Sequence, residues 1–375
     1  MTYDLESLRL LWWCVLGLML IGLILAEGLS MGAISLLPML ATTDRQQSSL
    51  IKAVAPSSLA NLGWLVVFML VLFAAWPVAY AVSLASFYPA LLLVLLALSV
   101  RPVALYFFDA IQHPLWVQHR RKLTAASAWL PASLFGLLIG NIIKGIPFHL
   151  ESDMQIRFLG DFAGLFNLFS LLVAATGLAL LAMHGSVFLW LKTSGELRQH
   201  AKAMAIRASV LFVVLFAVCG LWITHLEGYH ITSDILPNAA SNPLAKFVKR
   251  GEGLWLDNYE HIPALWAIPV LAFADALAVL ALTKWDKAYL AMLSSSLAVA
   301  MTVSTFAVSM FPFLLPSNIS LNSSLTIWDS SASPLALKVL LNVALYALPL
   351  MAVLSRWSFC LSGIQVESSE PEEEA

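Results

Sequence analysis

Charged residues are scarce in this chain. Asp, Glu, Lys and Arg make up 11% of its 375 residues, whereas hydrophobic residues make up 60%. Soluble domains are about 25% charged and about 45–50% apolar, so this composition excludes an ordinary soluble domain. The net charge of -2 comes without a long basic run, and this argues against a nucleic-acid partner.

Sequence motifs for chemistry are also missing. Cys14, Cys219 and Cys360 all lie in apolar stretches, without CxxC or Cys/His spacing. We therefore expect them to be buried thiols rather than metal or redox groups. The sequence contains no nucleotide-binding loop, zinc motif or catalytic-triad pattern. It predicts no catalytic residue and no metal site on this chain.

What the chain has instead is a series of long apolar stretches. Because a bilayer core takes about 20 apolar residues per helix, they predict an all-α, polytopic membrane protein of about nine transmembrane helices. We expect two four-helix bundles plus one helix, in a single domain over residues 1–360. The acidic segment 361–375 is predicted to be a disordered tail. The expected spans are 8–27, 59–82, 84–107, 123–143, 162–191, 204–225, 262–283, 288–312 and 335–357.

Two of these spans leave the count open. The second and third are nearly continuous, with Pro77 as the expected hinge between them. An alternative of eight spans treats that region as one span plus a re-entrant piece. The fifth stretch is longer than a bilayer needs, so we expect it to tilt or to project into water.

The distribution of Lys and Arg predicts the orientation. The loops after the third, fifth and seventh spans are basic and alternate correctly to share one side, which should be the cytoplasm. This places the N-terminus outside and the C-terminus in the cytoplasm. The cations of these loops are Arg120, Arg121, Lys122, Lys192, Arg198, Lys202, Arg207, Lys284 and Lys287.

Ionisable residues in or beside the spans are functional candidates. We expect a polar cluster of Glu27, Arg101 and Asp109, with the alternative that Arg101 extends to the inner headgroups. Asp275 lies well inside the seventh span, so it must pair with a cation across a helix interface or stay protonated. His184 is interpreted as hydrogen-bonded to a backbone carbonyl rather than as a haem ligand, because no second axial candidate pairs with it.

Several short runs, in their order and spacing, resemble subunit II of the bd-type quinol oxidases. The resemblance covers nearly the whole chain, from Leu8 to about Arg356. The runs are 8–13 (LRLLWW), 72–77 (LFAAWP) with Tyr80, 87–88 (FY), 101–103 (RPV), 140–141 (GN), 145–148 (GIPF), 192–193 (KT) with 195–197 (GEL), 241–244 (SNPL), 265–269 (LWAIP), 286–288 (DKA), 311–313 (FPF) and 324–329 (SLTIWD).

The resemblance implies a non-catalytic subunit of an enzyme that passes electrons from a membrane quinol to O2. Haem b, haem d and the quinol-oxidising loop would belong to the partner, the haem-bearing subunit I. This chain would support subunit I in a bacterial cytoplasmic (inner) membrane, among its lipids, and would lend passages for O2 and protons. In some members of the family this subunit also carries a bound quinone.

The same resemblance suggests roles for individual residues. Trp64 matches a family Trp near the subunit interface and is a candidate for lining an O2 path, with simple packing as the alternative. Trp328 and Asp329 are expected to fix the last outer loop, with Asp329 capping the next turn.

Three polar positions of the family are lost here. Ser30 stands where an acid is usual, Leu59 stands at a carboxylate position, and Ala110 stands where a base is usual. Leucine cannot relay a proton, and a buried charge that loses its partners is costly. We therefore predict that a proton route through this subunit is missing or rerouted.

Two other classes of protein remain open from the sequence. One is a diverged paralogue that acts as a membrane interaction protein for another partner. The other is a small-solute transporter, which the scarcity of polar groups near mid-membrane disfavours.

Overall fold

The computed structural model describes residues 4–367, without the side chains of Leu59 and of residues 361–367. Within this range it contains nine helices long and apolar enough to cross a membrane, so the nine-span prediction is confirmed and the eight-span alternative is wrong. They are α1 (Leu5–Ser35), α3 (Asp44–Ala75), α4 (Pro77–Tyr106), α5 (Pro114–Lys144), α6 (Leu168–Lys192), α7 (Gly195–Ile223), α9 (Ala267–Lys284), α10 (Ala288–Met310) and α11 (Pro334–Glu367).

Several predicted boundaries are wrong. Helix α3 starts at Asp44 rather than near residue 59, because Thr43 and Gln46 form a capping box at its N-terminus. The chain reverses at Trp76, and Pro77 is the first residue of α4, a position where proline costs no hydrogen bond. The fifth span is not overlong, since α6 begins only at Leu168. Of the predicted tail, 361–367 continue α11, and 368–375 lie outside the described residues.

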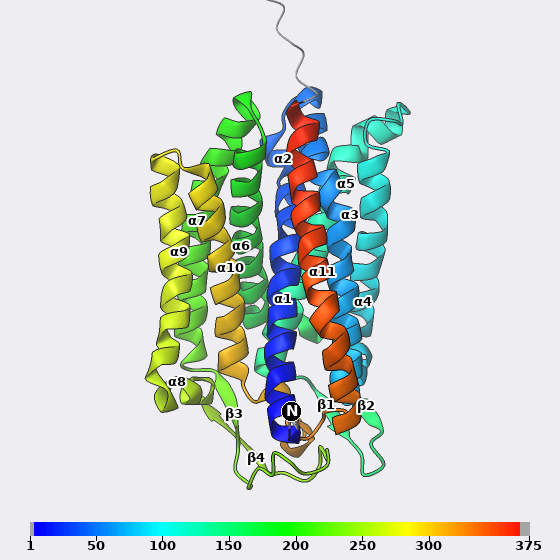
Figure 1. The fold of residues 1–375 in the computed structure, drawn as a ribbon, viewed down its shortest axis with the longest axis vertical. Coiled ribbons are helices and arrows are strands. Elements are labelled where there is room, and N and C mark those ends of the chain that lie inside the picture. Colours follow the sequence, from blue (N-terminus) through cyan, green and yellow to red (C-terminus); the bar gives the residue numbers. More distant parts are fainter. Residues whose placement is uncertain (1–3, 368–375) are drawn as a thin grey trace, which may run out of the picture.

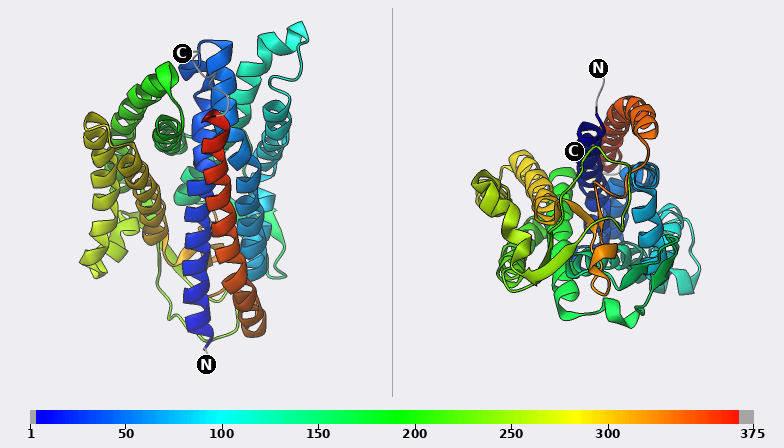
Figure 2. Two further views of the ribbon diagram at one scale, coloured as in Figure 1. Left: turned by 45° about the horizontal axis from the view of Figure 1, so that its top comes forward. Right: turned by 90° about the horizontal axis from the view of Figure 1, so that it is seen from below.

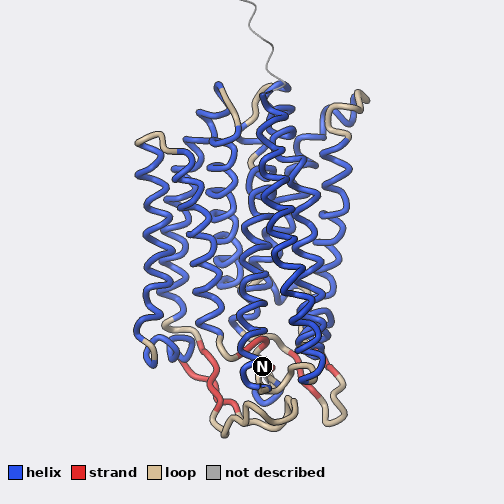
Figure 3. Tube along the Cα trace, in the orientation of Figure 1, coloured by secondary structure: helices blue, strands red, loops and turns tan. Residues whose placement is uncertain are grey.

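Short elements connect the helices. Three antiparallel strand pairs lie at the end of the molecule that also holds the N-terminus, whereas α11 ends at the opposite end (Figures 1, 2 and 3). We call the strand-bearing end the outer end, following the predicted orientation. The pairs are β1 (Phe148–Leu150) with β2 (Ile156–Phe158), β3 (Glu227–Ile231) with β4 (Val248–Glu252), and β5 (Phe313–Leu315) with β6 (Leu325–Thr326). The remaining short helices are α2 (Leu37–Leu40), α8 (Asp257–His261), η1 (Ala163–Leu165), η2 (Leu254–Leu256), η3 (Pro263–Trp266) and η4 (Leu321–Ser323).

Helix α1 occupies a central place in the helix packing. It packs against α3, α5, α6, α10 and α11, whereas α9 packs mainly against two of the long helices, α7 and α10. Figure 1 shows α9 at the edge of the molecule. The grouping into two four-helix bundles plus one helix stays a prediction.

The cysteines are not buried as expected, because the helix surface that faces away from the protein core is apolar too. Cys14 and Cys360 are exposed and Cys219 is half-buried. Buried thiols were expected because the surrounding stretches are apolar. In a membrane protein, however, an apolar stretch also faces lipid, so hydrophobicity alone does not indicate which side of a helix is buried.

Helices α1 and α6 touch through their backbones at two glycines. A Cβ added to Gly32 would collide with the backbone of Leu181, and one added to Gly185 would collide with the backbone around Gly32. We expect Gly185→Ala to lower the unfolding free energy by about 1–3 kcal/mol or more, since two rigid backbones must separate. Thermal unfolding of the purified protein in detergent measures this effect. Gly177→Ala is the matched control on α6, because its Cβ meets nothing within 4 Å, and an equal loss there would contradict the explanation.

Candidate functional site

Two buried charges within the transmembrane helices form an ion pair. Glu27 on α1 and Arg101 on α4 are bonded through Oε1 and Nη2, and their side chains are 4% and 0% exposed. The other carboxylate oxygen, Oε2, accepts a hydrogen bond of 3.0 Å from Ser30 Oγ, one turn along α1. The pair is neutral overall, which lowers the cost of burying either charge.

Neighbouring groups hold this ion pair in place. Asn61 on α3 donates its side-chain amide to the carbonyl of Ala26 and so ties α3 to α1 beside Glu27. Within the described part of the chain, Nε and Nη1 of Arg101 have no hydrogen-bond partner. Because Arg101 is fully buried, the alternative that it extends to the headgroups is wrong.

Asp109 does not join Glu27 and Arg101. It lies in the turn after α4, where it accepts a hydrogen bond of 2.8 Å from Ser48 and sits 3.4 Å from Arg120 Nη1. Arg120 also donates to the carbonyl of Phe108 at 2.8 Å and pairs with Asp44 at 3.1 Å. The structure therefore splits the expected cluster into a buried pair and a separate, partly exposed network at the end opposite the strands.

The three positions predicted to have lost a family acid or base lie on α1, on α3 and in the turn after α4. Ser30 is fully buried next to Glu27, and Ala110 is exposed in the turn after α4. Leu59 belongs to α3, but its side chain lies outside what the structure describes. Of these three positions, only Ser30 is shown in contact with the buried ion pair.

Another ion-pair network joins α7 to the turn between α9 and α10. Asp286 Oδ1 is 2.7 Å from Lys202 Nζ, and its Oδ2 is 3.6 Å from Arg198. The hydrogen bond from Lys202 holds the pKa of Asp286 below its usual value. A carboxylate with a lowered pKa stabilises the fold above its unfolded pKa, near 3.8, and loses this contribution as the pH falls through its folded pKa.

When the pH is lowered from about 4 to about 3, we expect Asp286→Asn to lose less thermal stability than the native protein. Asparagine also tolerates the left-handed backbone of this position, where φ is 53°, so the substitution changes charge and not geometry. Thermal midpoints of both proteins across this pH range are the measurement. Parallel curves would show that the ion pairs of Asp286 contribute nothing to stability.

Trp64 lies between three helices. It belongs to α3, is 7% exposed, and packs with Leu23 and Ala26 of α1. Its Nε1 donates a hydrogen bond of 2.7 Å to Ser355 Oγ on α11. These contacts agree with a packing role, and an O2 path along Trp64 stays a proposal.

Trp328 and Asp329 lie in a tight turn of the last outer loop. Asp329 accepts hydrogen bonds from Thr326, from N at 3.0 Å and from Oγ1 at 2.5 Å. It therefore closes its own turn, and the expectation that it caps the next one is wrong, because α11 starts only at Pro334. The ring of Trp328 meets that of Phe311 edge-on, with centroids 6.2 Å apart.

The carboxylate of Asp329 also binds a buried lysine. Lys246 Nζ lies 2.9 Å from Asp329 Oδ2, with side chains 7% and 12% exposed. Burial raises the pKa of Asp329 and lowers the pKa of Lys246, while their mutual attraction opposes both changes. This pair connects the loop between β3 and β4 to the loop that precedes α11.

Arg9 is the residue that sequence reasoning missed. Although it lies near the outer end of α1, it is fully buried. It donates to Ser331 Oγ at 2.8 Å and to Ser241 Oγ at 3.0 Å. It also donates to the carbonyls of Pro237 and Ala239, at 2.5 and 3.1 Å. One guanidinium thus joins α1 to both loops that the Lys246–Asp329 pair connects.

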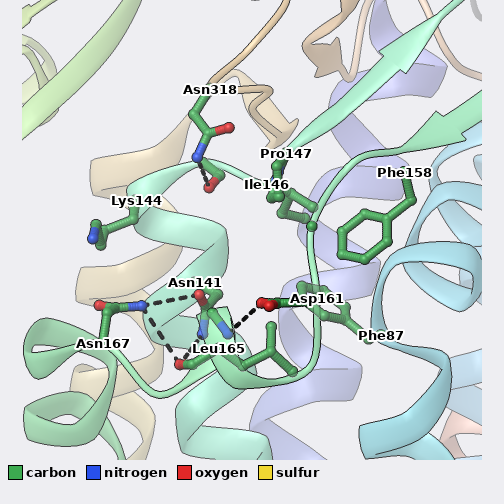
Figure 4. A pocket seen from close by; sticks show the side chains of 13 residues that line it. Phe87, Asn141, Lys144, Ile146, Pro147, Phe158, Asp161, Leu165, Asn167 and Asn318 are labelled. Carbon is green, nitrogen blue, oxygen red and sulfur yellow. Dashed lines mark hydrogen bonds between the residues drawn. The ribbon is translucent and has the colours of Figure 1, made fainter.

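The outer end also contains a small cavity of about 130 Å³, shown in Figure 4. Asn141 Nδ2 donates to the carbonyls of Leu137 and Leu165, both at 2.8 Å, and Asn167 Nδ2 donates to Asn141 Oδ1 at 3.1 Å. Asn318 Nδ2 donates to the carbonyl of Gly145 at 3.0 Å. Because these amides bind the protein itself, they fix the loops after α5 and β5.

The remaining two candidates are single groups. His184 is buried, its Nδ1 lies 2.9 Å from Ser295 Oγ on α10, and its ring also interacts with the backbone of Leu25 on α1, so a hydroxyl joins the expected backbone partner. Asp275 on α9 is half-buried. A search of the described residues finds no group of three or more His, Cys, Asp or Glu that could hold a metal ion.

Comparison with known proteins identifies the family. A family model described as cytochrome bd terminal oxidase subunit II matches residues 8–362. This chain belongs to that family. The resemblance inferred from the short sequence runs is therefore confirmed.

Relatives match this subunit II chain over nearly their full lengths. Cytochrome bd-I ubiquinol oxidase subunit 2 of Escherichia coli (strain K12) is 34% identical over 95% of this chain and 94% of its own. The probable cytochrome oxidase subunit 2 of Haemophilus influenzae is 35% identical, over the same shares. A chain of the bd oxidase structure from Geobacillus thermodenitrificans has the same fold, with a TM-score of 0.64, 16% identity, and coverage of 92% of this chain and 96% of that one.

Proposed function

We propose that this chain is subunit II of a bd-type quinol:O2 oxidoreductase, a terminal oxidase of a respiratory chain. The observation that carries the proposal is the family match over residues 8–362, together with relatives named as oxidase subunits that align along nearly their whole length. Nine apolar helices agree with a multi-pass protein of a bacterial inner membrane. The alternative, a paralogue that serves an unrelated membrane partner, is not favoured by this end-to-end similarity.

The proposed work of the chain is to support the haem-bearing subunit I, which would hold haem b and haem d. His184 tests whether a haem fits here. Its side chain is 1% exposed, and its Nδ1 lies 2.9 Å from Ser295 Oγ on α10. This close packing supports the proposal that His184 does not bind a haem and that the haems belong to subunit I. A quinone bound to this subunit is proposed from the family resemblance alone.

The buried pair suggests what this subunit does with protons. Glu27 accepts hydrogen bonds from both Arg101 and Ser30. To take up a proton, its carboxylate would have to release Arg101, which would then remain charged and buried without a counter-ion, a costly state. Glu27 therefore acts as a fixed counter-ion. Because Ser30, Leu59 and Ala110 replace acids or bases of the family, the proton route through this subunit is missing or rerouted.

The proton proposal is tested in vesicles that contain the whole purified oxidase. Restoring an acid with Leu59→Asp should change the rate of proton uptake during turnover, measured with a pH-sensitive dye. Leu59→Asn is the control of similar size without the charge. Normal proton uptake along this subunit in the native oxidase would overturn the proposal.

The assignment to an oxidase is tested by purifying the tagged chain from its native membrane and recording the reduced-minus-oxidised visible spectrum. Bands of haem b and haem d with a co-eluting larger subunit would establish the oxidase. Bands of haem b alone would keep the oxidase role with a different haem content. A haem-free chain bound to some other protein would overturn it.

A further inference from the structure

Asp275 lies at mid-membrane depth on α9. Trp266 precedes it by nine positions and Trp285 follows it by ten, and both rings are exposed, at 48% and 69%. Tryptophans in such positions mark the two membrane interfaces. At 1.5 Å per residue, each lies about 14–15 Å from Asp275 along the helix axis. An aspartate side chain is too short to reach either interface.

The described helices next to α9 offer the Asp275 carboxyl group neither a hydrogen bond nor an ion pair. Among the described residues, none forms a hydrogen bond or ion pair with Asp275. Helix α10 contains no Lys, Arg or His, and neither does α7 from residue 208 onward. Lys284 on the same helix is nine residues away and cannot meet it. The described helices that pack against α9 therefore supply no cation at this depth.

The orientation of α9 indicates where a partner could approach. Its buried side is formed by Ala272, Ala276, Val279 and Thr283. The ring of Phe273 packs against that of Phe216 of α7, with centroids 4.9 Å apart and the ring planes tilted by 47°, and so lies on the flank that faces α7. Steps of 100° per residue place Asp275 on the opposite flank, together with the exposed Leu271.

The surface beside Asp275 suits another helix. Ala274 is exposed and Ala278 is half-buried, and they are spaced by four residues next to the carboxyl group. Small residues at this spacing allow helix backbones to approach closely in a membrane. Helix α9 also lies at the edge of the bundle, with its outer side free of other elements of the described chain (Figures 1 and 2).

We propose that the flank of α9 around Asp275 is a docking surface for a transmembrane helix of a partner chain, and that this helix carries a Lys or Arg at mid-membrane depth. Charge complementarity identifies the occupant. A charged carboxylate inside a membrane is expensive unless it is paired, and a cation from a neighbouring helix removes that expense. This inference is argued from Asp275 and the packing of α9, so it stands independently of the proposed function.

The test places a photo-crosslinking amino acid at Leu271 in the full chain, in its native membrane. Leu277 is the matched control, equally exposed at 49% but on the other flank. We expect a crosslinked protein from position 271 and none from 277, with the attachment mapped to a peptide that contains Lys or Arg within an apolar segment.

The same probe is then combined with substitutions of Asp275. Asp275→Glu should retain the crosslink, whereas the isosteric Asp275→Asn should reduce it at least about tenfold, because a desolvated cation loses its counter-ion. Unchanged thermal unfolding of Asp275→Asn shows that the fold is intact. Three outcomes overturn the proposal: attachment to lipid alone, a crosslink indifferent to Asp275→Asn, or an attached helix without a basic residue.

Discussion

Replacing Arg101 with methionine is expected to lower the unfolding free energy of this subunit by about 3–5 kcal/mol, the largest effect of a single substitution in the membrane-spanning region. Methionine fills much of the volume of arginine but leaves the carboxylate of Glu27 buried without its cation. Breaking a buried pair costs more than the pair itself contributes, because the remaining charge has no solvent. Thermal and denaturant unfolding of the purified protein in detergent measure the loss.

A double-mutant cycle separates the pair from the packing around it. Glu27→Gln alone should also destabilise, since Arg101 then remains charged with an amide in place of a carboxylate. The combination of Glu27→Gln with Arg101→Met removes both charges, and its stability should recover most of the loss seen in Arg101→Met. Additive losses in the double variant would show that Glu27 and Arg101 are not coupled, contrary to the structure.

The number and type of the helices could be predicted from the sequence because lipid imposes a strict rule. Every span must be long, apolar and helical, so nine stretches became nine helices. The start of α3 could not be placed in this way. Residues 44–58 include Arg45 and Lys52 and have the composition of a loop, yet the capping box of Thr43 and Gln46 starts the helix there, beyond the apolar stretch.

The buried pair was partly predictable, and the outer cluster was not. Charges are so scarce in the spans that Glu27 and Arg101 were the natural partners. Asp109 was added because it is close to Arg101 in sequence, but α4 ends at Tyr106, and the following turn directs Asp109 to Arg120. The sequence does not mark Arg9 as a buried residue. Two of its acceptors are backbone carbonyls. Every residue has a carbonyl, so the sequence does not show which ones will accept a hydrogen bond from Arg9.

Arg9→Ala is expected to release the outer loops. Arg9 is fully buried and makes four hydrogen bonds, two to serine hydroxyls and two to carbonyls. A hydrogen bond to a charged group contributes about 1.5–3 kcal/mol, and the hydroxyl of Ser331, the one buried acceptor of the four, would lose this donor. We expect a loss of about 3 kcal/mol or more of unfolding free energy, together with faster proteolysis within residues 232–246.

Two variants show whether geometry or charge carries this effect. Arg9→Lys keeps the charge but not the planar fork, so it should retain only part of the stability and of the resistance to protease. Arg157→Ala removes another outer-end arginine, whose side chain is 62% exposed beside Glu151, and should cost at most about 1 kcal/mol. If Arg9→Lys matched the native protein, charge alone would hold the loops. If Arg9→Ala matched Arg157→Ala, the four hydrogen bonds would contribute little, and the Lys246–Asp329 pair would be what keeps the two loops together.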